Sequence, residues 1–237
     1  MAAERDFDVI VFGATGVTGR RVAGYLAEQA AAHGRPWAAA ARDAGKLERV
    51  LAEDGVSAPE AIVADVGDPA SLAAMAARTR VVLDLVGPYT LYGRPVIEAC
   101  VSQGAHYIDL TGEIPFVRQI IEAYDARAAS AGVKIVQVCG FEALPPDLLV
   151  LLAAETARER FGEGLDEADV QVSIEGPPGM PRPSDLISGG TFQSLAAAAG
   201  GEDASAVTDP GALIADPARA GSVTAEASSP PAAAARL

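Results

Sequence analysis

Residues 8–19 decide the fold, and they read Asp8-Val9-Ile10-Val11-Phe12-Gly13-Ala14-Thr15-Gly16-Val17-Thr18-Gly19. The residues before the first glycine form a short apolar run rich in β-branched side chains, which is typical of a parallel strand buried on both faces. Glycines follow at positions 13, 16 and 19, and a helical pattern begins at once. A strand, a glycine turn and a helix in this order are typical of the phosphate-binding corner of a dinucleotide fold.

The three glycines have different expected roles in this corner. Gly13 permits the tight turn, Gly16 lets the backbone approach a pyrophosphate, and Gly19 lets the helix pack closely on the strand. The pyrophosphate would bind free N–H groups at the helix N-terminus, where the macrodipole also favours negative charge. The alternative is a glycine-rich turn that binds nothing, and the strand before the motif and the helix after it argue against that alternative.

The rest of the N-terminal part repeats the alternation of strand and helix. Further strands are predicted over residues 37–41, 61–64, 81–86, 107–110 and 133–138. Helices are predicted between them, over residues 43–53, 69–78 and 95–103 and over a segment that ends near residue 131. Six strands that alternate with helices predict an α/β fold, a Rossmann-type doubly wound parallel sheet with right-handed crossovers.

The composition changes after this sheet, and three regions are expected. Residues 1–145 form the NAD(P)-binding Rossmann domain, and residues 146–196 form part of an α+β substrate domain. The second region contains a predicted helix over 147–160, an alternating strand over 170–174, a Pro- and Gly-rich loop over 176–183 and a helix over 189–195. Residues 197–237 are rich in Ala, Pro, Gly, Ser and acidic residues, so they are expected to form a disordered tail.

The overall composition excludes several classes of protein. The 237 residues carry a net charge of −14, which disfavours binding to nucleic acid or to anionic lipid head groups. The two cysteines, Cys100 and Cys139, lie in apolar surroundings, and together with a charged N-terminus they predict a reduced, cytoplasmic protein. No apolar run approaches the roughly 18 residues of a membrane span. Neither His33 nor His106 has ligand-type neighbours at metal spacing, so no metal is expected.

Two residues beyond the glycine turn are expected to contact the adenosine half of the cofactor. Arg42 ends the second predicted strand, where an Arg can bind a ribose 2′-phosphate through two hydrogen bonds. This favours NADP over NAD, although the neighbouring Asp43 leaves NAD open. Alternatively Arg42 pairs with Asp43 or Glu48. Asp65 ends the third strand, where it either meets the adenine edge or caps a turn.

The remaining candidates follow the fourth, fifth and sixth strands. Gly87 and Pro88 end the fourth strand, where the nicotinamide ribose normally lies, and Tyr89 either offers its hydroxyl to the reacting centre or only packs. Asp109 either orients substrate and transfers a proton or has a local structural role. Thr111 and Glu113 lie beside it, as a possible helix N-cap and a first-turn acid. Cys100 is expected in the core, and Cys139 either approaches the nicotinamide or packs as a small residue.

Four segments resemble the saccharopine dehydrogenase-like oxidoreductases, particularly the branch of the trans-acting enoyl reductases. They read VFGATGVTGRRVAGYL, DLVGPYTLYGRPVIEAC, HYIDLTGE and VCGFEALPPDL, and the later SGGTFQS is also similar. The resemblance covers about residues 7–195. It implies an NAD(P)-binding Rossmann domain followed by a substrate domain, and it gives the cofactor role to Gly13, Thr15, Gly16, Val17, Thr18, Gly19 and Arg42.

The resemblance also implies hydride transfer, and for the nearest branch it implies reduction of a lipid-linked intermediate at the inner membrane face. Family members run well beyond the SGGT segment, so this chain is expected to be a truncated copy that keeps the cofactor domain. We therefore predict an NADP-dependent oxidoreductase, with enoyl reduction of a lipid or polyketide intermediate as its reaction. The first alternative is a dinucleotide-binding module without catalysis. The second is an amino-dicarboxylate dehydrogenase, for which Arg94 and Arg118 are the available carboxylate clamps.

Overall fold

The computed structural model describes residues 5–57, 60–171, 209, 211–214 and 218. Its six strands are β1 (Phe7–Phe12), β2 (Trp37–Ala41), β3 (Ala61–Val63), β4 (Thr79–Asp84), β5 (His106–Asp109) and β6 (Ile135–Val136). Its helices are α1 (Val17–His33), α2 (Ala44–Glu53), α3 (Pro69–Ala77), α4 (Tyr89–Gln103), α5 (Ile114–Ala131) and α6 (Leu144–Phe161). Strands and helices therefore alternate through most of the described chain.

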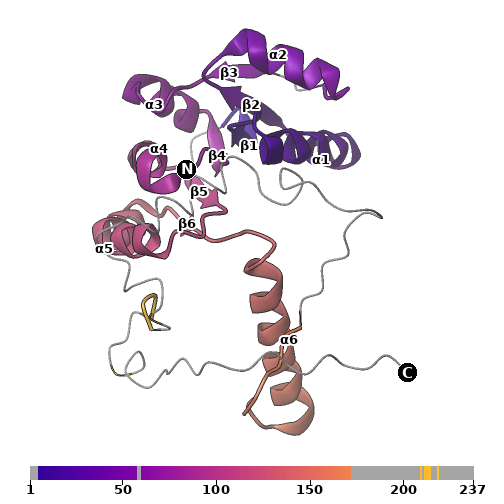
Figure 1. Ribbon diagram of the computed structural model, residues 1–237, viewed down its shortest axis with the longest axis vertical. Helices are drawn as coiled ribbons and strands as arrows, with labels where there is room; N and C mark the ends of the chain where they lie inside the picture. Colours follow the sequence, from indigo (N-terminus) through magenta and orange to yellow (C-terminus); the bar gives the residue numbers. More distant parts are fainter. Residues whose placement is uncertain (1–4, 58–59, 172–208, 210, 215–217, 219–237) are drawn as a thin grey trace, which may run out of the picture.

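The strands form one parallel sheet in the order β3-β2-β1-β4-β5-β6 (Figure 1). Strand β1 lies at the centre and pairs with β2 on one side and with β4 on the other. The chain thus winds outward from β1 in both directions, and the order reverses between β1 and β4. The predicted Rossmann-type doubly wound sheet is confirmed.

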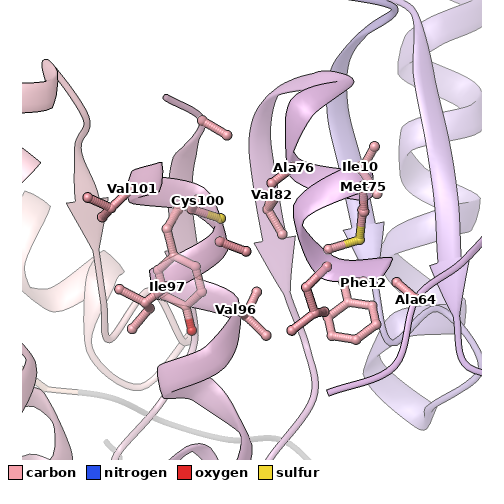
Figure 2. Packing of buried hydrophobic residues seen from close by; sticks show 14 of the residues in the cluster. Ile10, Phe12, Ala64, Met75, Ala76, Val82, Val96, Ile97, Cys100 and Val101 are labelled. Atoms are coloured by element: carbon pink, nitrogen blue, oxygen red, sulfur yellow. The ribbon is translucent and has the colours of Figure 1, made fainter. Parts of the chain in front are cut away.

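Both faces of the sheet are covered by helices, and β1 contributes side chains to both. Ile10 and Phe12 belong to a large buried cluster with residues of α3, α4 and α5, part of which Figure 2 shows. Val11 points the other way, into a cluster with residues of α1 and α2. This alternation explains why the β1 sequence is apolar throughout, as a strand buried on both faces must be.

The helix ends follow local signals for the most part. Asp43 and Asp68 cap α2 and α3 by accepting hydrogen bonds from Lys46 N (2.9 Å) and Ala70 N (3.0 Å). Gly34, Gly104 and Gly132 end α1, α4 and α5 in the left-handed conformation. These caps agree with the sequence-based boundaries of α2 and α3 and with the predicted ends of α4 and α5.

The start of α4 and the length of β6 differ most from the prediction. Helix α4 begins at Tyr89 rather than Pro95, because its N-terminus is capped from elsewhere in the fold and Pro95 lies inside it. Strand β6 has only two residues, because the backbone turns away at Val138, whose φ is 62°. The predicted strand would have continued to that residue.

Helix α6 is set apart from the sheet. None of its residues is buried, and Figure 1 shows it extending away from the other elements. It spans the helix predicted over 147–160 and begins three residues earlier. In the predicted strand over 170–174, Val170 and Gln171 are described and are not in a strand. The rest of that strand, the loop over 176–183 and the helix over 189–195 lie outside the described residues, as does nearly all of the predicted tail.

Candidate cofactor site

The strand order reverses between β1 and β4, and in doubly wound sheets the ligand-binding crevice lies at the carboxyl ends of the strands at such a reversal. Phe12 at the end of β1 pairs in register with Asp84 at the end of β4. In open α/β sheets a ligand binds outside the strand ends at such a reversal. The residues that follow these two strands, 13–19 and 85–89, are therefore the walls of the candidate site.

The turn after β1 is built on its glycines. Gly13 has a φ of 89°, a left-handed conformation that favours glycine, and its N–H donates to the carbonyl oxygen of Ala40 at 2.9 Å. A Cβ on Gly19 would overlap the carbonyl oxygen of Gly13 and lie 2.8 Å from Ala14 Cα. The predicted roles of Gly13 in the tight turn and Gly19 in close helix packing fit this geometry.

The N-terminus of α1 is open. Gly16 is its N-cap residue, no side chain caps it, and the first turn contains no acidic residue. The first backbone hydrogen bond of the helix runs from Arg20 N to Gly16 O (2.9 Å), so the N–H groups of the three preceding residues have no partner within the helix. Val17 and Thr18 are exposed, whereas Gly19 is buried and Gly16 N donates to Gly13 O at 3.0 Å. The N–H groups of Val17 and Thr18 therefore suit a pyrophosphate.

Gly16 has the conformation needed for close approach. Its φ of −79° suits any residue, so the turn itself does not require glycine there. A Cβ added to Gly16 would lie 3.3 Å from Gly13 O, at the start of α1. Thr15 is partly exposed beside it. The turn therefore leaves room for a bulky anion.

Arg42 follows β2 next to this turn. The placement is fixed because Ala40 O, two residues earlier, accepts hydrogen bonds from Gly13 N and from Ala14 N (3.2 Å). The Asp43 carboxylate is used as the α2 cap. In the described part of the chain Arg42 makes no ion pair, so the alternative pairing with Asp43 or Glu48 is not formed. Its exposed guanidinium is available for a phosphate.

Asp65 has the turn role that was the alternative for it. Its Oδ1 accepts a hydrogen bond from Gly67 N at 2.7 Å, and its backbone N–H donates to Ser71 Oγ. This local turn explains an acid at the end of β3 without a ligand. Contact of Asp65 with the adenine edge stays a prediction.

The segment after β4 is closed by a carboxylate from the β5–α5 loop. Glu113 Oε1 accepts from Tyr89 N at 2.9 Å and Oε2 accepts from Thr90 N at 2.8 Å, and Thr90 Oγ1 donates to Oε2 as well. Glu113 is buried, so it is a cap for α4 rather than a first-turn charge of its own helix. Gly87 and Pro88 join β4 to this cap, and the peptide bond between them is cis.

Tyr89 and Asp109, the two predicted catalytic residues, are both buried. Tyr89 is 5% exposed and its hydroxyl donates to the carbonyl oxygen of Asp84 at 3.1 Å. Burial raises the pKa of Tyr89 above its ordinary value. Asp109 is fully buried and accepts hydrogen bonds from four donors on β5, on the loop after it and on the segment after β6. Both side chains thus have structural partners, and their catalytic roles stay predictions.

Asp84 is a polar residue of the site that sequence reasoning missed. It is fully buried at the end of β4, opposite Asp109 in register, and burial raises its pKa to about 8. The available signal was an acid at the end of an otherwise apolar strand. Tyr107 lies between the two carboxyls, with its hydroxyl oxygen 3.1 Å from Asp84 Oδ2 and 2.9 Å from Asp109 Oδ2.

The cysteines have packing roles. Cys100 is fully buried in the core, as predicted, and burial raises the pKa of its thiol. Cys139 is half-buried, and burial raises its pKa as well, so neither thiol is activated. Within the described residues no group of three or more His, Cys, Asp or Glu side chains could hold a metal ion.

None of the described helices has the length and apolarity needed to cross a membrane.

The comparisons of this chain with known proteins agree on one family. A family model described as the saccharopine dehydrogenase NADP-binding domain matches residues 9–136. A protein of Mycobacterium tuberculosis named trans-acting enoyl reductase is 41% identical over 167 residues, which is 69% of this chain and 40% of that protein. The Mycobacterium leprae protein of the same name is 41% identical over 167 residues and is covered to 39% of its length. The chain thus spans about two-fifths of the length of these relatives.

The solved structures that resemble this chain include apo saccharopine dehydrogenase (L-Glu forming) from Saccharomyces cerevisiae. It is 22% identical with a TM-score of 0.47, and the match covers 65% of this chain and 31% of that one. The family match lies within the predicted cofactor domain, and the predictions of NADP as the cofactor and of this family are confirmed. The chain belongs to the saccharopine dehydrogenase NADP-binding domain family.

Proposed function

We propose that this chain is the NADP-binding part of an oxidoreductase that reduces the carbon–carbon double bond of an acyl or polyketide-derived substrate. The observation that carries the proposal is the open N-terminus of α1 at the reversal of strand order, beside Arg42, which forms no ion pair with another described residue. The relatives named trans-acting enoyl reductase supply the reaction type. Access to a lipid-linked substrate at the inner membrane face, from the cytoplasmic side, is the finer part of the proposal.

The fit of the site to NADP rests on its donors. The backbone N–H groups of Val17, Thr18 and Gly19 would donate hydrogen bonds to the pyrophosphate, and the Arg42 guanidinium would donate to the 2′-phosphate. Thr15 and Gly16 line the surface between them. When bound, NADPH supplies a hydride. Gly87 and Pro88 then hold the backbone after β4 at the position where the nicotinamide ribose normally lies.

A second function is favoured by a specific observation. Both predicted catalytic side chains, Tyr89 and Asp109, are buried and bonded to the protein. A dinucleotide-binding module without catalysis would have this arrangement. The amino-dicarboxylate alternative gains no such support, because Arg118 pairs with Glu122 and Arg94 lies 5.8 Å from the centre of the Tyr124 ring.

The deciding experiment measures the dissociation constants of NADPH and NADH by fluorescence in the wild type and in Arg42→Ala. We expect the variant to lose about tenfold in NADPH affinity and little in NADH affinity, since a charge-assisted hydrogen bond contributes roughly 1.5–3 kcal/mol. Arg35→Ala is the matched control, because it removes the same charge just before the other end of β2. An NADPH preference that persists in Arg42→Ala would refute the assignment of this residue.

Turnover separates the two functions. Oxidation of NADPH is followed in the presence of crotonoyl coenzyme A and longer enoyl thioesters. Reduction of any of them supports the enoyl reductase. Tight NADPH binding without oxidation across the series supports the binding module.

A further inference from the structure

Three buried oxygen-bearing side chains form a continuous row beneath the crevice. Asp84 ends β4, Asp109 ends β5, and the two residues are direct neighbours in the sheet. The hydroxyl of Tyr107 lies between their carboxyl groups, 3.1 Å from Asp84 Oδ2 and 2.9 Å from Asp109 Oδ2. All three side chains are fully buried.

The number of protons in this row follows from the chemistry of a hydroxyl. Tyr107 has one hydroxyl proton, so it can donate to one carboxyl only. If both carboxyls were ionised, the second contact would place a carboxylate oxygen against the lone pairs of the Tyr107 oxygen in a buried site. A hydrogen bond in each of the two contacts therefore requires a second proton, and this proton must come from one of the aspartates.

The neighbouring donors show which aspartate carries it. Asp109 accepts from Thr111 N and Val138 N at 3.1 Å each and from Gln137 Nε2 at 3.3 Å, besides Tyr107. Asp84 accepts one N–H, from Val86, on Oδ1 (2.9 Å). Since hydrogen-bond donors stabilise the ionised form, Asp109 holds the negative charge. The Oδ2 of Asp84 then donates to Tyr107, and Tyr107 donates to Asp109.

We propose that Asp84 and Asp109 share one proton through Tyr107, and that this linked pair is a positioning device for the segments after β4 and β6, on the β4 side of the cofactor crevice. Asp84 holds the β4–α4 segment through Val86 N, and its backbone oxygen accepts from the Tyr89 hydroxyl. Asp109 holds the segment after β6 through residues 137 and 138. Its link to cofactor binding rests on the proposed NADP site, whereas the proton count rests on the geometry alone.

The surroundings of the row contain other titratable groups, but within the described residues neither Asp84 nor Asp109 forms an ion pair. From α4, Cys100 and Tyr89 face Asp84, Glu113 lies near Tyr89, and Cys139 lies near Asp109. Burial raises the pKa of Asp84 to about 8 and raises that of Asp109 too. The raised pKa values of these thiols and phenols keep them neutral below that pH, so the titration of the row there belongs to the carboxyls of Asp84 and Asp109.

The sign of the pH dependence follows. The folded protein retains on Asp84 a proton that the unfolded chain releases near its ordinary pKa of 3.8. The contribution of Asp84 to stability therefore falls as the pH rises from that value to about 8, and is constant above it. The lowered pKa values of Glu60 and Glu98 act in the opposite direction and in the acidic range, so the two effects are separable.

The experiment uses the cofactor-free full chain labelled with ¹³C-aspartate. Infrared spectroscopy at neutral pH should show the carbonyl band of a protonated carboxylic acid, and the band should disappear in Asp84→Asn and in alkaline buffer. Absence of this band from the wild type at neutral pH would overturn the proposal. Because no cofactor is present, this outcome is independent of the NADP site.

Two matched amide variants test the assignment of the proton. Asp84→Asn keeps a donor toward Tyr107, so the variant should fold and lose the pH dependence of urea unfolding between acidic and mildly alkaline pH. Asp109→Asn replaces one carboxylate oxygen by an NH₂ group that faces the hydrogen-bond donors of Asp109. This variant should therefore be markedly less stable. Equal tolerance of both, or the reverse order, would contradict the assignment.

A third measurement tests the link to the crevice. NADPH affinity should weaken in the wild type as the pH rises through the titration of Asp84, and should be flatter in Asp84→Asn. If both proteins bind NADPH with the same pH profile, the pair does not position the crevice. If neither binds NADPH while the acid band is present, the proposed function fails and the proton assignment stands.

Discussion

The crevice is bordered by two helix N-termini, of which one has no side-chain cap and the other is capped by a buried carboxylate. Helix α1 begins with exposed amides, no capping side chain and no acid in its first turn. Helix α4 begins with amides that are bonded to the buried Glu113 carboxylate. Both helices follow central strands of the sheet, so the fold offers two similar corners.

Because of this difference, the two ends of the crevice suit ligand groups of different charge. A phosphate can bind at the α1 corner, where partial positive charge is unpaired, but would meet a carboxylate at the α4 corner. The α4 corner instead suits the uncharged or cationic end of a ligand. A dinucleotide with its phosphates at α1 and its nicotinamide toward β4 has this distribution of charge.

The largest expected effect on stability comes from removing the carboxylate that caps α4. Glu113→Ala leaves two N–H groups at the start of α4 and the Thr90 hydroxyl without their carboxylate, and should lower the free energy of unfolding by about 3 kcal/mol. Urea denaturation measures it. Glu122→Ala on exposed α5 surface is the control, and should cost less than about 1 kcal/mol. Equal effects would mean that the cap of α4 is not structural.

The next effect comes from closing the open corner. Gly16→Asp gives α1 an acidic N-cap, which should stabilise the fold by about a few tenths of a kcal/mol and weaken NADPH binding by roughly 2 kcal/mol. The conformation of Gly16 accepts a side chain, with Gly13 O needing to shift slightly. Thermal unfolding and NADPH titration measure the two effects.

Gly16→Asn separates charge from bulk in the same corner. It caps α1 without a negative charge, so it should lose less NADPH affinity than Gly16→Asp. If the two variants bind NADPH equally, the amides at this corner do not bind the phosphates.

The smallest effect concerns the charge beside Arg42. Asp43→Asn preserves a side-chain oxygen that can cap α2 but removes a negative charge next to the 2′-phosphate position. NADPH affinity should rise about two- to threefold, as expected for roughly 0.5 kcal/mol between exposed charges, with NADH affinity nearly unchanged. An equal rise in NADPH and NADH affinity would show that the 2′-phosphate is not responsible for the effect.

The parts of the fold set by local sequence were predictable. The apolar runs, the glycine turn and the helix caps at Asp43, Asp68 and Gly104 depend on neighbouring residues, and they lie where the sequence indicates. The start of α4 depends instead on Glu113, 23 or 24 residues further along the chain. Pro95 resembled a helix start because proline is favoured there, and no nearby residue signalled the true cap.

The candidate site divides in the same way. The glycines and Arg42 follow from spacing along one βα unit, since the turn and the end of β2 are joined by Ala40. The Asp84–Tyr107–Asp109 row needs β4 and β5 in register, which no single segment of the sequence specifies. For this reason the sequence leaves both a catalytic and a structural role open for Asp109, and it does not reveal the four donors that occupy its oxygens.

Strand β2 is made of one tryptophan and four buried alanines, and two of them, Ala39 and Ala41, face α1 and α2. Each of these two positions contributes only a methyl group to the contact with those helices. We expect a valine or leucine at either position to overfill this contact and to push α1 or α2 away from β2, because packed interiors have little room for added methylene groups. Alanine at these positions is therefore a spacer between the sheet and its helices.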